Sequence, residues 1–338
     1  MIKDIIIGCM AQDLVSINDF QAGPPALSGA SEQALFSMLE FFNARIGNRR
    51  TRRAYKRAVA DFFVFCMGLP GGDRLESMTS LHVAAWRDGM EAAGLSRPTV
   101  KARLAALRRF FAVLVERRVV SGNPAEVVRG PKHTVVKGRT PVLTGTEMAS
   151  LLASIDTSSL AGLRDRALIG CMAYSFARVG AVIDLRVEDV FRQRQRLWLR
   201  LREKRGKVIE VPCHHACENY LVEYMERAGL KGQAKAALFQ SFATGGARKD
   251  GGRGLSGRPL TQGAVWEMVR RRAAEAGIET AVCNHTFRAT GITAYLTNGG
   301  TIERAAVMAG HASTRTTQLY DRRPDDVTQE EVEKIRFG

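Results

Sequence analysis

The chain has 338 residues, enough for about two domains with substantial hydrophobic cores. Its 50 lysines and arginines outnumber its 34 aspartates and glutamates, and the net charge of +16 favours binding to a polyanion such as nucleic acid. No apolar run approaches the roughly 20 residues of a membrane helix, and no signal peptide is recognisable. Six dispersed cysteines are typical of reduced thiols, so we expect a cytoplasmic protein that does not bind a membrane.

The first part of the chain predicts a helical domain. Residues 1–30 show little periodic pattern and are treated as an N-terminal extension, whereas 31–123 predict a compact, basic, all-helical domain whose first helix Ser31 can cap. Pro98 stands near the start of a later helix, where its missing N–H is harmless. The expected apolar stripes of three helices are Leu35, Met38, Leu39 and Phe42, then Ala58, Phe62 and Phe65, then Leu104, Leu107, Phe111 and Leu114.

Basic residues are concentrated in this domain and just after it. Seven of the thirteen residues from Arg45 to Arg57 are lysine or arginine. Such a run is ordinarily a solvated helix face, but in an already basic protein we expect it to contact the DNA backbone. The residues predicted to bind DNA are Arg49, Arg50, Arg52, Arg53, Lys56, Lys101, Arg108, Lys137 and Arg139.

A linker and a second domain come next. Residues 124–142 contain three prolines and several basic residues, which indicates an extended linker that lies along DNA. The second domain is expected over 143–325, with a tail at 326–338. Leu197, Leu199 and Leu201 alternate with other residues before the turn "EKRGK", and "VIEVP" resumes the pattern, so this stretch predicts a β-hairpin with a basic tip.

The remaining segments of the second domain read as helices and loops. The stretch "TGGARKDGGRGLSGRPL" reads as a Gly/Arg-rich loop, and the residues after it read mostly as helix. The expected fold class is mainly α with a small β-hairpin or sheet in the C-terminal domain (α+β).

Residues 285–323 contain the strongest functional pattern. His285 and Arg288 are three residues apart, which would place both on one face of a helix that continues to Gly299-Gly300. Thr301 can cap the next short helix, after which Gly310 delivers His311 at a turn, and Tyr320 is nine residues further on. Each residue alone has an ordinary structural explanation, but the four together in one 36-residue span are far more specific.

These residue types suit attack on a phosphodiester without a metal ion. A tyrosine hydroxyl is a nucleophile when a base or a cationic field helps to remove its proton. Arginines bind the non-bridging oxygens of a phosphate, and histidines relay protons near neutral pH. A two-metal nuclease would need clustered aspartates and glutamates, which this segment lacks, so no metal and no cofactor are expected.

The motifs "HTFR", "GH" with "TTQLY" after it, and upstream "YSFARVGAVIDLRVEDV" resemble the tyrosine recombinases, or phage integrase family. The resemblance covers roughly residues 31–325. It implies a two-domain clamp on double-stranded DNA, a site-specific recombinase or integrase of a mobile element, and strand cleavage through a 3′-phosphotyrosine. It also implies a homotetramer on two paired sites, with a dimer on each site.

The resemblance assigns roles to six residues. Arg178 and Arg288 would clamp the scissile phosphate, and Lys204 would protonate the leaving 5′-hydroxyl, with Lys207 a close rival. His285 would accept a proton, His311 would donate a hydrogen bond to the phosphate, and Tyr320 would be the nucleophile. Many relatives carry an acidic residue three positions after the first arginine, where this chain has Ala181. That departure leaves the support of Arg178 unexplained.

Several alternatives stay open at this point. A type IB topoisomerase uses a similar residue set but acts alone, and a non-catalytic architectural protein could retain the DNA-binding surfaces. A metal-dependent nuclease is a further alternative. The cluster "PCHHAC" (213–217 with the preceding proline) resembles metal ligands, but its spacing is not that of a standard zinc site.

Overall fold

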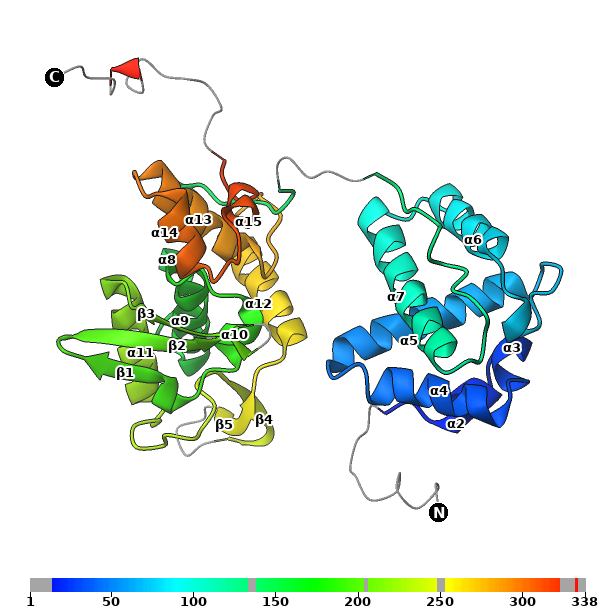
Figure 1. Ribbon diagram of the computed structural model, residues 1–338. Helices are drawn as coiled ribbons and strands as arrows, with labels where there is room; N and C mark the ends of the chain where they lie inside the picture. Colours follow the sequence, from blue (N-terminus) through cyan, green and yellow to red (C-terminus); the bar gives the residue numbers. More distant parts are fainter. Residues whose placement is uncertain (1–13, 133–137, 204–205, 248–252, 323–331, 334–338) are drawn as a thin grey trace. The chain divides into compact units, whose positions relative to one another are not determined.

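The computed structural model describes residues 14–132, 138–203, 206–247, 253–322 and 332–333. The chain divides into two compact units, residues 1–134 and 135–338, and each is described by itself (Figure 1). The dividing point lies inside the stretch 124–142. Among the described residues, no helix is long and apolar enough to cross a membrane.

The elements described in the first unit are all helices. The Ser31 hydroxyl accepts a hydrogen bond from the Ala34 N–H at 3.2 Å, as predicted, and Asn48 Oδ1 accepts from the Thr51 N–H at 3.0 Å, so both side chains cap helices. The elements are α2 (Ile17–Gln21), α3 (Pro25–Ser28), α4 (Glu32–Asn43), α5 (Arg49–Cys66), a 3-10 turn (Leu75–Ser77), α6 (Ser80–Ala92) and α7 (Arg97–Glu116).

An aromatic core holds these helices together. Phenylalanine pairs from three helices meet edge to face, with ring centroids 4.8–6.2 Å apart. The predicted stripe of α7 is confirmed, because all four of its side chains are fully buried. On α5 the prediction is wrong for Phe65, which is 36% exposed, because the buried face continues through Phe63 and Cys66 instead. The core phenylalanines are Phe41, Phe42, Phe62, Phe63, Phe110 and Phe111.

The start of the predicted linker packs on this first unit rather than extending away from it. Ala125 and Val128 are buried. Arg108 Nε donates to the Ala125 carbonyl at 3.0 Å, and its terminal nitrogen donates to the Val128 carbonyl. Apolar side chains and the half-buried guanidinium of Arg108 therefore fix this stretch, which the proline spacing alone did not reveal.

The second unit combines helices with two small antiparallel sheets. Helix α9 is buried on all sides, and α11 and α13 pack against it. The elements are α8 (Gly145–Ser154), α9 (Leu160–Tyr174), α10 (Val179–Ile183), a 3-10 turn (Val187–Asp189), β1 (Val190–Gln193), β2 (Arg196–Arg202), β3 (Val208–Pro212), α11 (His215–Arg227), β4 (Gln240–Ala247), β5 (Arg253–Pro259), α12 (Gln262–Glu275), α13 (Thr286–Thr297), α14 (Ile302–Met308) and α15 (Thr314–Gln318).

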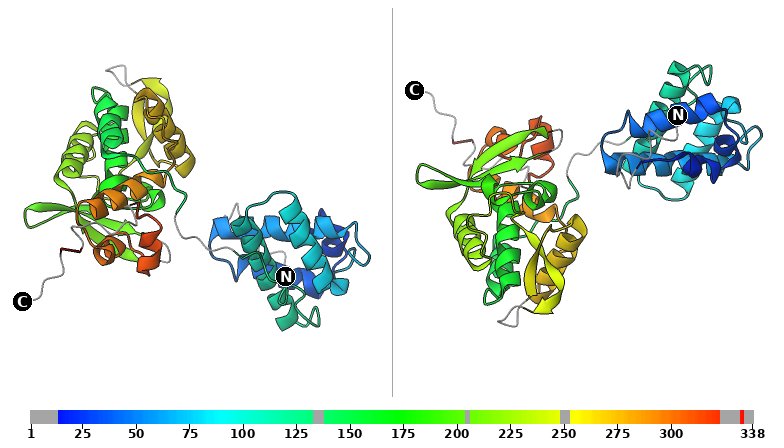
Figure 2. Two further views of the ribbon diagram at one scale, coloured as in Figure 1. Left: turned by 90° about the horizontal axis from the view of Figure 1, so that it is seen from above. Right: turned by 90° about the horizontal axis from the view of Figure 1, so that it is seen from below.

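The predicted hairpin is strands β2 and β3, and β1 completes a three-stranded sheet in the order β1-β2-β3. Leu197, Leu199 and Leu201 are buried, which confirms the alternating pattern. The Gly/Arg-rich stretch was wrongly expected to be a loop, since it contains most of the hairpin β4–β5, which lies beside α12 in both views of Figure 2. Glycine lowers β propensity, but Phe242 pairs across this hairpin with Leu255, and Arg164 stacks on the Phe242 ring.

Candidate active site

Arg288 lies at the centre of the candidate site, in the first turn of α13. It is only 1% exposed. One terminal nitrogen donates to the Phe176 carbonyl, and the other lies 2.7 Å from the Ala309 carbonyl and 2.5 Å from His311 Nε2. Within the described residues, its buried Nε has no hydrogen-bond partner. Arg288 therefore joins the end of α9, the start of α13 and the turn after α14.

The turn between α9 and α10 delivers Arg178 to the same place. Phe176 has a φ of 54°, which is rare for a non-glycine residue. Just before it, the Ala173 carbonyl approaches Gly291 of α13 so closely that a Cβ there would lie 2.0 Å from the oxygen. Arg178 then precedes α10, with its side chain 27% exposed. The sharp turn lets one arginine stay partly open to solvent beside the buried one.

Glu203 contacts both arginines and was not predicted as a site residue. Its carboxylate, 4% exposed, accepts a hydrogen bond from Arg178 and lies 4.0 Å from a terminal nitrogen of Arg288. It stands at the end of β2, directly before Lys204. The signal that could have identified it was a single acidic residue in the otherwise basic turn "EKRGK".

His311 is held in one protonation state. The Gly310 φ of 64° produces the predicted turn, and a Cβ there would lie 2.3 Å from Ile209 Cδ1. Because a guanidinium only donates hydrogen bonds, His311 Nε2 must accept from Arg288, and its Nδ1–H then donates to Thr317 Oγ1 at 2.8 Å. Burial, together with the charges of the neighbouring arginines and of Lys207, lowers the pKa of His311 to about 3.

Tyr320 comes after α15 and lies against His311. The two rings are stacked, with centroids 5.8 Å apart and an interplanar angle of 9°. The Thr293 hydroxyl of α13 donates to the Tyr320 carbonyl at 2.7 Å. These contacts bring together Arg288, His311 and Tyr320, the residues that the spacing in the sequence singled out.

The segment around Tyr320 is also braced by the chain that leads into this unit. The Gly138 N–H donates to the Leu319 carbonyl at 3.0 Å, and Arg322 donates to the carbonyls of Gly138 and Thr140. A Cβ at position 138 would lie 2.2 Å from the Leu319 oxygen, so only glycine allows this approach. Two stretches far apart in sequence thus form one support for the tyrosine.

The remaining catalytic candidates are less closely defined. His285 immediately precedes α13 and is exposed, whereas Arg288, three residues on, is buried. Lys204 lies outside the described residues. Lys207 is exposed on the other side of the hairpin turn, and its charge contributes to the lowered pKa of His311, which places it within electrostatic reach of the site.

The predicted DNA-binding residues fall into distinct groups. Arg52 and Arg108 correct the expectation, because both guanidiniums point inward. Arg52 is 8% exposed, and its Nε and a terminal nitrogen each lie 2.8 Å from a backbone carbonyl, those of Phe42 and Ile46. Lys56 forms an ion pair with Asp19 at 2.7 Å, and Lys137 lies outside the described residues. Exposed members of the set are Arg49, Arg50, Arg53, Lys101 and Arg139.

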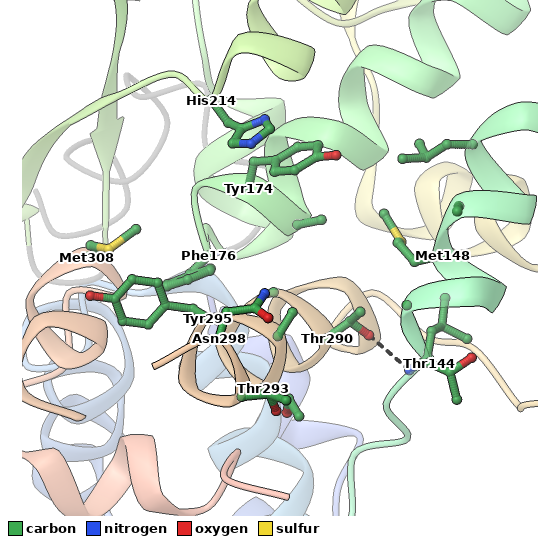
Figure 3. A pocket seen from close by; sticks show the side chains of 18 of the residues that line it. Thr144, Met148, Tyr174, Phe176, His214, Thr290, Thr293, Tyr295, Asn298 and Met308 are labelled. Atoms are coloured by element: carbon green, nitrogen blue, oxygen red, sulfur yellow. Dashed lines mark hydrogen bonds between the residues drawn. The ribbon is translucent and has the colours of Figure 1, made fainter. Parts of the chain in front are cut away.

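A cavity of about 810 Å³ lies between α8, α9 and α13 (Figure 3). Its walls are mainly apolar, and none of the predicted catalytic residues lines it. His214 borders it and stacks on Tyr174, with ring centroids 4.4 Å apart. Cys213 and Cys217 are buried, and the described residues contain no cluster of three or more metal-ligand side chains. His214 caps the start of α11, where its Nδ1 accepts a hydrogen bond from the Ala216 N–H at 3.2 Å.

The chain is similar to proteins of a known family. Residues 141–326 match the phage integrase family, and 40–118 match its N-terminal SAM-like domain. The chain is 28% identical over 225 residues to tyrosine recombinase XerD of Lacticaseibacillus casei, covering 66% of this chain and 71% of that protein. It is 26% identical over 230 residues to XerD of Staphylococcus aureus strain Mu50, covering 67% and 72%.

Solved structures resemble the fold at lower sequence identity. The XerH site-specific recombinase in a pre-cleavage complex with difH matches with a TM-score of 0.65 and 18% identity, covering 94% of this chain and 92% of that one. A lambda integrase fragment bound to a COC′ core site matches with a TM-score of 0.65 and 18% identity, covering 88% and 99%. Since the family match spans more than half of its length, the chain belongs to the phage integrase family, the tyrosine recombinases.

Proposed function

We propose that this site-specific recombinase cuts and rejoins double-stranded DNA through a 3′-phosphotyrosine on Tyr320, without a metal ion. The observation that carries the proposal is the contact of Arg288 with His311 at 2.5 Å, with the Tyr320 ring stacked on His311. The three residues come from different segments of the chain, and their convergence supports a common task.

The arginines would hold the scissile phosphate. Arg178 is partly exposed and Arg288 has a buried N–H without a partner among the described residues, so the pair can offer donors to the non-bridging oxygens. In the reaction, a bond forms between the Tyr320 oxygen and phosphorus while the bond from phosphorus to the 5′ oxygen breaks. Fixed cations beside the phosphate stabilise the charge that builds up there.

Two proton transfers accompany the step. Tyr320 loses its proton to a base, the role we assign to the exposed His285, and the leaving 5′ oxygen receives one from Lys204, with Lys207 as the rival. His311 now accepts from Arg288, so donating to the phosphate requires a proton on Nε2, which a bound anion would favour. Rejoining reverses these transfers with a 5′-hydroxyl from another strand.

The active assembly we propose is a homotetramer on two paired DNA sites, a dimer on each. Exchange of two duplexes needs four strand cleavages, one for each protomer. Lambda integrase, a structural neighbour with a TM-score of 0.62, has been solved as a tetramer bound to a Holliday junction. Because the substrate is chromosomal or mobile-element DNA, we expect the protein on the nucleoid in the cytoplasm.

The test is a search for the covalent bond. Wild type and Tyr320→Phe are expressed with the DNA that flanks the gene, cells are denatured rapidly in EDTA, and DNA is probed for attached protein. An adduct in wild type that is absent from the Phe variant would support the proposal, and sequencing the attached DNA would locate the site. An adduct in both proteins would move the nucleophile elsewhere.

Other outcomes would favour the alternatives. Tight DNA binding without any adduct would indicate an architectural protein. Relaxation of supercoiled DNA without site preference would indicate a type IB topoisomerase activity. Cleavage that stops when EDTA is added would indicate a metal-dependent nuclease.

A further inference from the structure

We propose that Glu203 is a positioning residue that orients Arg178 and Arg288 and couples the β2–β3 hairpin to them. This inference rests on the proposed function and extends it to a residue outside the predicted set. The structural basis is one buried carboxylate that reaches both guanidiniums from a third element of the fold.

The contacts define the arrangement. One carboxylate oxygen of Glu203 accepts a hydrogen bond from Arg178, and the other lies 4.0 Å from a terminal nitrogen of Arg288. A carboxylate has two oxygens, so it can bridge two guanidiniums and fix the angle between them. The angle matters, because both arginines must address one phosphate.

The exposed fractions of Glu203 and Arg178 show that the carboxylate lies on the interior side of Arg178. Glu203 is 4% exposed, whereas Arg178 is 27% exposed. DNA reaches the site from solvent and therefore meets Arg178 on its open side, while Glu203 holds it from the protein interior. A carboxylate in this place supports the arginine rather than competing with the phosphate.

Electrostatics gives a reason for an acidic group here. Arg178 and Arg288 carry like charges that lie close together and repel each other, and the burial of Arg288 strengthens this repulsion. Burial and the nearby Arg178 charge lower the pKa of Arg288 to about 10, while Tyr320 and Glu203 act in the opposite direction. Removing the negative charge of Glu203 would therefore leave the repulsion between the arginines with less compensation.

Glu203 also ties the hairpin to the site. Its N–H donates to the Lys207 carbonyl at 2.7 Å, which closes the turn that contains Lys204. Its Cγ lies 3.6 Å from the place that a Cβ on Gly310 would occupy, so the side chain packs against the turn that presents His311. The backbone at Lys207, the two arginines and the turn that presents His311 thus all contact one buried residue.

This contact accounts for the departure at Ala181. That side chain is buried in the core of the second unit and offers no charge. The carboxylate that supports Arg178 here comes instead from the residue that follows β2, a strand that packs beside α10 (Figure 1). The same electrostatic task is performed from a different position in the sequence.

The test uses the full chain and a DNA duplex that carries the cleavage site located by adduct sequencing. Single-turnover formation of the Tyr320 adduct is measured for wild type, Glu203→Gln, Glu203→Asp and Arg178→Ala, and for Glu203→Gln combined with Arg178→Ala. Glu210→Gln is the matched control, because Glu210 lies in the same hairpin and pairs with Arg200 at 2.9 Å, but is 43% exposed. DNA affinity and thermal unfolding are measured for every variant.

We expect Glu203→Gln to slow adduct formation about 10–100-fold, a typical loss for a residue that orients a reacting group, while DNA affinity changes less than about twofold. Glu203→Asp, which keeps the charge, should lose less than Glu203→Gln, and Glu210→Gln should match wild type. In the Arg178→Ala background the Gln substitution should cause a smaller fractional loss, because its contact with Arg178 is already gone and only its contact with Arg288 remains to be lost.

Three results would overturn the inference while leaving the proposed function intact. The first is an unchanged rate of adduct formation in Glu203→Gln. The second is a rate for Glu203→Asp that is as low as the rate for Glu203→Gln. The third is that Glu203→Gln lowers the rate by the same factor whether Arg178 is present or replaced by alanine. A wild-type protein that forms no Tyr320-dependent adduct would refute the proposed function, and this inference with it.

Discussion

Arg52 in the first unit and Arg288 in the second are both buried arginines whose guanidiniums donate to backbone carbonyls. They differ in what surrounds them. Arg52 joins the end of α4 to the turn before α5 within the first unit, whereas Arg288 lies in the second unit beside a second arginine, a histidine and a tyrosine. Burial of a charge therefore marks a site only when other reactive groups converge on it.

The largest effect should come from Arg288→Ala. The substitution removes a fixed charge beside the reacting phosphate, so adduct formation should fall roughly 10²–10³-fold. Some stability should be lost as well, because the Phe176 and Ala309 carbonyls lose their donor. Single-turnover cleavage by the protein fraction that remains folded separates the two effects, and a near wild-type rate would remove Arg288 from the clamp.

Arg52→Ala should have the opposite pattern of effects, a loss of stability with little loss of cleavage rate. Loss of two buried hydrogen bonds should lower the free energy of unfolding by roughly 2–3 kcal/mol, with cleavage by the folded protein nearly unchanged. Urea unfolding and single-turnover cleavage of the same preparation provide the measurement. A fall in cleavage rate without loss of stability would return Arg52 to the set of functional residues.

His311 should make the second unit sensitive to acid. Its pKa is lowered from 6.5 to about 3 on folding. A lowered histidine pKa gives a stability contribution that is fully present above the unfolded value and is lost as the pH falls through this window, at up to about 1.4 kcal/mol per pH unit. In urea unfolding between pH 6 and 4, the stability advantage of wild type over His311→Gln should shrink; a constant difference would contradict the lowered pKa.

The smallest effect should come from the exposed basic residues of α5. If Arg53 contacts a DNA phosphate, Arg53→Ala should reduce the slope of log affinity against log salt by about 0.9. Lys56→Ala, which breaks a surface pair with Asp19, should cost less than about 1 kcal/mol of stability. Equal slopes for wild type and Arg53→Ala would place the DNA on another face of the first unit.

The sequence predicted the elements whose patterns are local. The cap at Ser31, the stripe of α7, the hairpin β2–β3 and the turn at Gly310 arise from side-chain periodicity and backbone preferences within a few residues. The hairpin β4–β5 was missed, because its glycine-rich strands carry little periodic signal and depend on pairing with each other.

The residues of the candidate site also fall into those that a local pattern indicates and those that depend on distant contacts. Arg288, His311 and Tyr320 lie within one short span, and their spacing alone indicated a common site. Glu203 was missed because its role depends on contacts with Arg178 and Arg288, which are 25 and 85 residues away in the chain. The inward direction of Arg52 was also missed, because composition alone does not separate a carbonyl-bound arginine from one that faces solvent.

The hydrogen bond from the Gly138 N–H to the Leu319 carbonyl joins the beginning of the second unit to a segment near its end. The segment that enters the unit and the segment that carries Tyr320 are joined across 181 residues of sequence. An independent catalytic fragment must therefore start before Gly138, although the family match starts only at residue 141. A fragment that begins at the matched boundary would lack the hydrogen bond to Leu319, beside Tyr320, although it would keep every predicted catalytic residue.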